Sequence, residues 1–101
     1  MEELKGAQKK YLRGLAHDLN PSAIVGHKGI TPALIEEIDQ ALDASELIKV
    51  KFIDFKEKEQ KTALSGQIAA QTKAHIAGMI GHVLILYRRN KDAQKQHIQL
   101  P

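Results

Sequence analysis

The residues whose types and spacing best suit ligand binding form a short loop, Gly26-His27-Lys28-Gly29. The loop follows the apolar run Ala23-Ile24-Val25 and precedes Thr31-Pro32, a pair typical of a helix start. The free amides and the positive dipole end of a helix N-terminus favour a phosphate group. The glycines let the backbone approach an anion closely, Lys28 adds positive charge, and His27 can donate a hydrogen bond or stack. The spacing therefore predicts an anion-binding loop.

The Gly-x-x-Gly spacing is a weak signal by itself. With 7 glycines among 101 residues, chance alone gives about 0.5 such pairs. A second copy, Gly78-Met79-Ile80-Gly81, has apolar inner residues and precedes an expected hairpin, so we interpret it as structural. The first copy is distinguished by the strand before it, the capped helix after it and the lysine inside it. KH domains clamp a nucleic-acid backbone with such a loop. A plain tight turn is the alternative, and these features alone favour neither.

The sequence carries no enzymatic signature. It has no cysteine, which excludes disulfides, thiol catalysis and thiolate metal sites. It also lacks a Gly-x-Ser-x-Gly elbow, a P-loop and a dinucleotide-binding fingerprint. No two histidines lie on one helix at metal-ligand spacing; the five are His17, His27, His75, His82 and His97. We therefore expect no catalytic residue, no metal, no cofactor and no small-molecule substrate.

Charge is distributed unevenly along the chain. Its 15 Lys and Arg against 12 Asp and Glu give a net charge of +3. Residues 32–46 hold five of the acidic residues and no basic one, a net charge of −5, which leaves +8 for the rest. A basic face attracts polyanions such as nucleic acid, and the alternative is a solvated surface that maintains solubility. The candidate basic residues are Lys10, Arg13, Lys49, Lys51, Arg88 and Arg89.

Helical spacing and a helix-start signal predict two helices and a strand in the first half of the chain. The first helix ends at Asn20-Pro21, and its apolar stripe is Tyr11, Leu12, Leu15, Ala16 and Leu19. A short buried strand is expected over 23–25. The second helix begins at Thr31-Pro32 and carries the acidic residues on its outer face.

Alternation and turn signals predict three strands and a helix in the second half. Over 47–53, Ile48, Val50 and Phe52 face one way while Lys49 and Lys51 face the other. A third helix is expected over 56–72. Strands over 75–80 and 83–87 are joined by Gly81-His82, which suits a tight hairpin. Residues 88–101 form a polar tail with Ile98 and Leu100 as anchors. Tyr11, Tyr87 and Phe52 are expected in the core, so base stacking on exposed aromatic residues is not expected.

These elements predict one domain over residues 1–101, in the order α-β-α-β-α-β-β. Such an order implies an α/β fold of two layers, with a four-stranded mixed sheet packed by helices. The longest apolar run, Val83 to Tyr87, is far too short to span a membrane. The N-terminus lacks the apolar stretch of a signal peptide, and we expect a cytoplasmic protein.

Several segments, in order along nearly the whole chain, resemble the YhbY-type domain. This family is also called the CRM domain, for chloroplast RNA splicing and ribosome maturation. Its signature loop is similar to Val25-Gly26-His27-Lys28-Gly29-Ile30-Thr31. The other matching segments are Leu12 to His17 with Asn20-Pro21, Glu46 to Lys51, Ile80-Gly81 with Val83 to Arg88, and Ile98 to Pro101.

The resemblance implies a stand-alone bacterial RNA-binding protein associated with precursors of the large ribosomal subunit. It implies a four-stranded mixed sheet similar to that of the C-terminal domain of translation initiation factor 3. The family loop maps onto Gly26 to Gly29, and the family's basic surface maps onto Lys49, Lys51 and Arg88. The chain departs from the family at Lys73, where a glycine is frequent, and at Arg89, where a proline is frequent.

Our leading hypothesis is a non-enzymatic protein that binds ribosomal RNA. The predicted RNA-binding residues are Gly26, His27, Lys28, Gly29, Thr31, Lys49, Lys51, Arg88, Arg89, Lys10 and Arg13. The alternative is an adaptor in ribosome assembly, whose acidic second helix, with Glu36, Glu37 and Asp39, binds a ribosomal protein or an assembly factor. An RNA-acting enzyme built from residues distant in sequence is the weakest of the three hypotheses.

Overall fold

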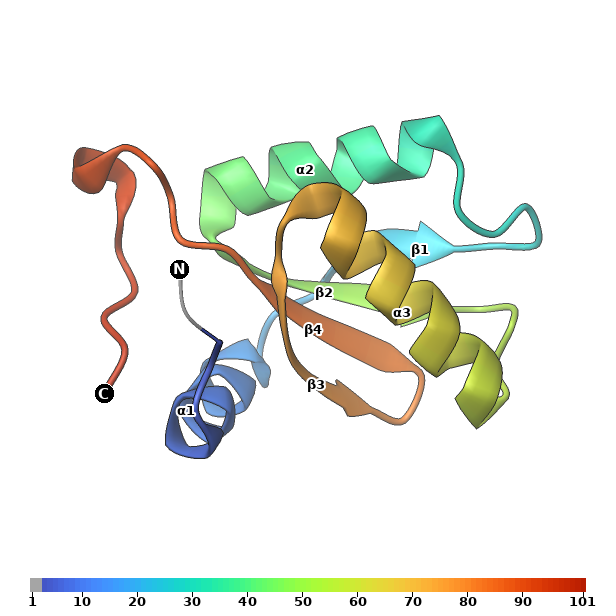
Figure 1. Ribbon diagram of the computed structural model, residues 1–101, viewed down its shortest axis with the longest axis horizontal. Coiled ribbons are helices and arrows are strands. Elements are labelled where there is room, and N and C mark those ends of the chain that lie inside the picture. Colours follow the sequence, from blue (N-terminus) through green and yellow to red (C-terminus); the bar gives the residue numbers. More distant parts are fainter. Residues whose placement is uncertain (1–2) are drawn as a thin grey trace.

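The order of helices and strands in the computed structural model, which describes residues 3–101, is the predicted one (Figure 1). The helices are α1 Gly6–Ala16, α2 Pro32–Ser45 and α3 Lys58–Thr72. The strands are β1 Pro21–Val25, β2 Leu47–Phe52, β3 His75–Ile80 and β4 Val83–Tyr87. A 3₁₀ turn, Ala93–Lys95, lies in the C-terminal tail. No helix in the described residues is both long enough and apolar enough to span a lipid bilayer.

The strands form one mixed sheet in the order β1-β2-β4-β3. β1 and β2 are parallel, which is the expected outcome for two strands joined through the crossover helix α2. β4 is antiparallel to both of its neighbours, β2 and β3. The C-terminal ends of β1, β2 and β3 therefore lie at one end of the sheet, together with the turn that begins β4.

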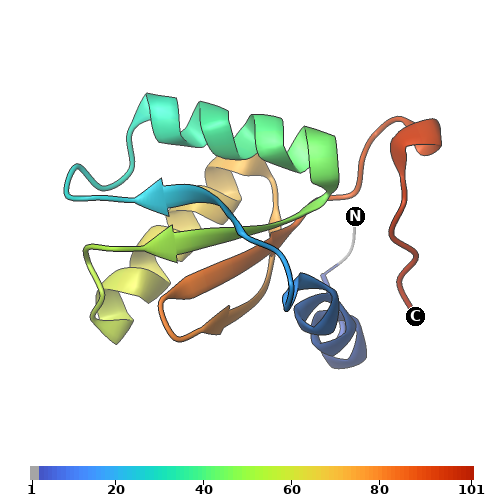
Figure 2. The same ribbon diagram turned by 180° about the vertical axis from the view of Figure 1, so that it is seen from behind.

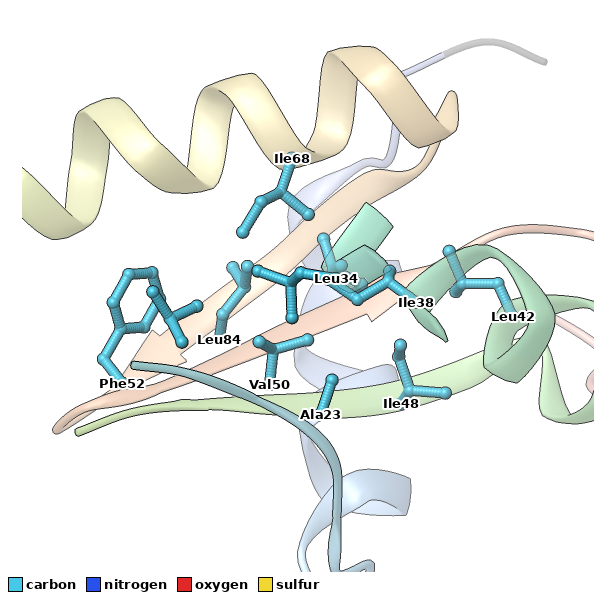
Figure 3. Packing of buried hydrophobic residues seen from close by; sticks show 11 residues of the cluster. Ala23, Leu34, Ile38, Leu42, Ile48, Val50, Phe52, Ile68 and Leu84 are labelled. Carbon is cyan, nitrogen blue, oxygen red and sulfur yellow. The ribbon is translucent and has the colours of Figure 1, made fainter. Parts of the chain in front are cut away.

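The larger core lies between the sheet and helices α2 and α3 (Figure 3). Ile48, Val50 and Phe52 of β2 point into it, as their alternation predicts, and each is at most 1% exposed. Ile38 of α2 and Ile68 of α3 cover them from above. The residues of this face that point into the core hold the strands together and are covered by the two helices.

A second core lies on the opposite face of the sheet. Leu12 and Ala16 of α1 pack there against Leu47, Ile85 and Tyr87, and the tail adds Ile98 and Leu100 as predicted. Figure 2 shows α1 on the side of the sheet away from α2 and α3. The fold class is confirmed, but the expected two layers are three, because α1 and the tail cover part of the second face.

The apolar stripe predicted for the first helix is only partly buried. α1 turns Leu12 and Ala16 to the sheet, whereas Tyr11, Leu15 and Leu19 are each about two-fifths exposed. The prediction that Tyr11 lies in the core is therefore wrong. Ile24 is also exposed, because β1 is an edge strand and α1 does not extend over its alternate positions.

Two backbone positions explain where α3 begins and ends. The helix starts at Lys58 and not at the predicted Lys56, because Glu57 is its N-cap and has an extended backbone, with φ −66 and ψ 146. It ends at Thr72 because Lys73 has φ +56. Glycine adopts that conformation without steric cost. The left-handed backbone at Lys73 is thus a physical reason for the glycine that the family resemblance implies at this position.

Candidate functional site

The Gly26–Gly29 loop is a tight turn. The backbone N–H of Gly29 donates to the carbonyl oxygen of Gly26 at 3.0 Å, which sets His27 and Lys28 at the exposed tip. Among residues 3–101, no intramolecular acceptor faces the backbone N–H of His27 or of Lys28. Two free amides and an ammonium group at one exposed tip suit an anion such as phosphate.

The neighbouring loop between β2 and α3 holds this turn in place. Gly29 has φ +66, and the ring of Phe55 lies 3.5 Å from where a Cβ of residue 29 would stand. The N–H of Phe55 donates to the carboxylate of Asp54 at 2.8 Å, which supports its own positive φ. Gly26 has neither a positive φ nor a crowding neighbour. The positive φ therefore favours a glycine at position 29, whereas nothing in the fold favours one at position 26.

The N-terminus of α2 offers fewer donors than the sequence suggests. Thr31 caps the helix as predicted, because its Oγ1 accepts the N–H of Leu34 at 3.1 Å. Its carbonyl accepts the N–H of Ile35, and Pro32 has no N–H. Within the described chain this leaves Ala33 as the first-turn residue with a free donor. The anion would thus meet mainly the loop amides, and Thr31 has a structural role as the helix cap.

Three loops converge at this end of the sheet. The N–H of Ile53 donates to the carbonyl of Val25 at 3.1 Å, and the N–H of Phe52 donates to the carbonyl of His82 at 2.8 Å. The β2–α3 loop therefore lies beside the Gly26–Gly29 loop on one side and beside the β3–β4 turn on the other, and all three lie at the same end of the sheet (Figures 1 and 2). This end of the sheet also carries three lysines that were not among the predicted site residues, Lys56, Lys58 and Lys61, together with the carboxylates of Asp54, Glu57 and Glu59.

Lys61 and His82 belong to this group of positive charges. Lys61 Nζ donates to the carbonyl of Gly81 at 2.7 Å and lies 3.2 Å from His82 Nδ1. Desolvation, followed by the charges of Lys61 and Lys56, holds the pKa of His82 below its usual value of 6.5. The lowered pKa reflects desolvation first and the two neighbouring lysines second. In the sequence, the only indication of these lysines was the charged segment at the start of the expected third helix.

Of the two predicted strand lysines, one is exposed near the loop and the other is engaged. Lys51 pairs in register with Ile24 and Val83 and is exposed, one residue before the end of β2. Lys49 Nζ donates to the carbonyls of His17 and Leu19 at 2.9 and 3.0 Å. It thereby holds the exit of α1 against the sheet.

The basic residues of α1 lie along the other face of the sheet. Lys10 is exposed. Arg13 is half-buried, and its Nη1 donates to the carbonyl of Ala77 at 2.9 Å. Its side chain lies over Gly78, where a Cβ would stand only 2.6 Å from Arg13 Cδ. Gly78 of the second Gly-x-x-Gly copy is thus part of a packed strand, as the sequence interpretation holds.

Arg88 and Arg89 lie at the opposite end of the sheet from the loop. Arg88 donates to the carboxylates of Asp39 at 2.5 Å and Asp43 at 2.8 Å, and to the carbonyl of Thr72 at 2.8 Å. It therefore ties α2 to the end of α3. Arg89 is exposed and donates to Gln96 at 3.3 Å. The structure does not bring the predicted basic residues together into one patch.

The acidic residues of 32–46 do not form one solvated face. Asp39 and Asp43 are bound to Arg88. Glu46 follows α2 with φ +61 and is fully buried, which corrects its expected place on the outer face. Its carboxylate accepts the backbone N–H of Asn90 at 2.7 Å and of His97 at 2.9 Å, and so fixes the tail. Burial alone would raise the pKa of Glu46, but these N–H groups, that of Ile98 and the charge of His97 lower it overall.

Residues 3–101 contain no cluster of three or more His, Asp or Glu side chains arranged to hold a metal ion. The features described above define a class: a small α+β domain with an exposed Gly-x-x-Gly turn at one end of a mixed sheet. Residues 4–88 match the model of the CRS1 / YhbY (CRM) domain. The chain belongs to this family.

Relatives of similar length support this assignment. The chain is 43% identical over its whole length to a protein of Haemophilus influenzae named "RNA-binding protein", 98% of which is covered. It is 35% identical to "Probable RNA-binding protein YqeI" of Bacillus subtilis, over 97% of this chain and 99% of that protein. The solution structure of the hypothetical protein SAV1595 from Staphylococcus aureus is similar, with a TM-score of 0.82 and 34% identity. That match covers 97% of this chain and 99% of SAV1595.

Proposed function

We propose that this chain is an RNA-binding protein and that the Gly26–Gly29 loop holds phosphates of the RNA backbone. The observation that carries the proposal is the exposed tip, where the N–H groups of His27 and Lys28 are free and the Lys28 ammonium stands beside them. The names of the relatives from Haemophilus influenzae and Bacillus subtilis support RNA as the polyanion.

The binding would be electrostatic and would follow the backbone. A phosphate accepts the two loop amides and pairs with Lys28, while Lys51, Lys56 and Lys58 neutralise adjacent phosphates. Such contacts position a protein without reading sequence, so the shape of the RNA supplies specificity. No step of catalysis, no metal and no cofactor enters this function.

The target we propose is ribosomal RNA in precursors of the large ribosomal subunit, in the cytoplasm. This follows from the family resemblance, since bacterial CRM-domain proteins are associated with those particles. Contacts with ribosomal proteins through α2 are less favoured. Asp39 and Asp43 are already bound to Arg88 and Glu46 is buried, which leaves Glu36 and Glu37 as exposed carboxylates of α2 outside these contacts.

The test compares RNA binding by the wild type, Lys28→Ala and the control Lys91→Ala, an exposed lysine in the tail. The probes are fragments of large-subunit ribosomal RNA at about 50 and 200 mM salt. For four phosphate contacts the affinity should fall about fiftyfold over that range, and Lys28→Ala should lower the number of contacts by about one. Equal binding by all three proteins would refute the loop's role. Glu36→Gln with Glu37→Gln should leave RNA binding intact.

A further inference from the structure

A pocket between α3 and the β3–β4 hairpin has no role in the function proposed above. Its volume is about 430 Å³, within the range of small-ligand sites. Apolar side chains form part of its wall: Ile76 and Met79 of β3, both half-buried, and Leu84 of β4. The pocket is therefore a place where a flat apolar group can leave water.

One wall of the pocket carries a polar group without a partner. Ser65 of α3 lines the pocket and is 3% exposed, and its hydroxyl oxygen has no hydrogen-bond partner among the described residues. A buried hydroxyl without a partner is unfavourable, and native structures seldom leave one. A ligand that brings a donor or an acceptor would satisfy it, because a hydroxyl can both donate and accept.

The mouth of the pocket is positively charged and lies at the same end as the loop. Lys58 and Lys61 of α3 line it, and the contact from Lys61 Nζ to the carbonyl of Gly81 ties its two sides together. Lys58 begins α3 three residues after Phe55, whose ring packs against Gly29. A strand held by the loop at Gly29 would thus have lysines leading it toward this pocket.

We infer that the pocket binds one unpaired nucleobase of the RNA strand whose backbone the Gly26–Gly29 loop holds. The base would lie against Ile76 and Met79, a polar atom of its edge would pair with the Ser65 hydroxyl, and Lys58 would neutralise a flanking phosphate. This inference rests on the proposed function. It adds a preference for single-stranded RNA, which backbone contacts alone do not give.

The test uses a short single-stranded RNA and the same strand with one abasic nucleotide placed in turn at each position. The proteins are the wild type, Ser65→Ala and the control Ser45→Ala, an exposed serine at the end of α2. Affinity is measured by fluorescence anisotropy, and the methyl resonances of Ile76, Met79 and Leu84 are followed by NMR. At one position the abasic strand should bind the wild type about three- to tenfold more weakly, the fold-change of one hydrogen bond with apolar contact.

That difference should shrink in Ser65→Ala to the part that apolar contact supplies and persist in full in Ser45→Ala, and the methyl signals should shift only with the intact strand. Because Ser65→Ala removes an unpaired buried hydroxyl, it should fold at least as well as the wild type. Equal binding of intact and abasic strands with unshifted methyl signals would overturn the pocket and leave the proposed function standing.

If no RNA binds, the proposed function fails, and free adenosine and uridine monophosphates at millimolar concentration then decide on the pocket. Shifts of the same methyl signals would support it, and their absence would overturn it.

Discussion

Replacing each glycine of the loop separately distinguishes what the fold requires from what a ligand requires. At Gly29 the backbone has φ +66, and an alanine in that conformation loses about 1–2 kcal/mol. Part of this loss is offset, because alanine reduces the freedom of the unfolded chain by about 0.4–1 kcal/mol. The Phe55 ring at 3.5 Å adds no clash. We therefore expect Gly29→Ala to lose about 1 kcal/mol, or about 4–8 °C in Tm for a domain of this size.

At Gly26 the backbone has no positive φ, and a Cβ would meet open space. Gly26→Ala should therefore stay within about 0.5 kcal/mol of the wild type. The new methyl group would stand beside the free loop amides, so RNA affinity should fall about tenfold by loss of a close phosphate contact. Thermal melts followed by circular dichroism and RNA titrations measure the two effects. A Gly26→Ala protein that melts as low as Gly29→Ala, or that binds RNA like the wild type, would refute this reasoning.

Three further predictions concern the ends of the helices and the tail. Lys73→Gly should raise the free energy of unfolding by about 1 kcal/mol, because Lys73 has φ +56; an unchanged urea midpoint would contradict this. Because the pKa of Glu46 is lowered from 4.5 in the folded state, its contribution to stability is complete above that pH and is lost as the pH falls toward the lowered pKa. Urea unfolding between pH 7 and 3 should show this loss in the wild type and a weaker one in Glu46→Gln, and parallel curves would argue against it. Arg88→Ala should lose about 2 kcal/mol by freeing Asp39, Asp43 and the carbonyl of Thr72, yet bind RNA like the wild type when folded. A stable Arg88→Ala protein with weakened RNA binding would place Arg88 in the interface.

Local patterns were enough to predict most of the architecture. The alternation of Ile48, Val50 and Phe52 against Lys49 and Lys51 determines which face of β2 is buried. Thr31-Pro32 determines where α2 begins, and Gly81 takes the positive φ that its hairpin turn needs. The loop itself could be recognised because strand, loop and helix cap are consecutive in the chain. Each of these features depends on neighbours a few residues away.

What the sequence could not supply was the set of contacts between distant segments. The sequence predicts free surface charges at Lys49, Arg13 and Arg88. In the structure each of them hydrogen-bonds a residue 32 or more positions away: Lys49 bonds His17, Arg13 bonds Ala77, and Arg88 bonds Asp39.

Only the tertiary structure separates these engaged charges from Lys28 and Lys51, and only it brings Lys56, Lys58 and Lys61 to the end of the sheet where the loop lies. The physical reason is that periodicity reports the face on which a side chain lies. Its hydrogen-bond partners depend on how strands and helices far apart in the chain pack together.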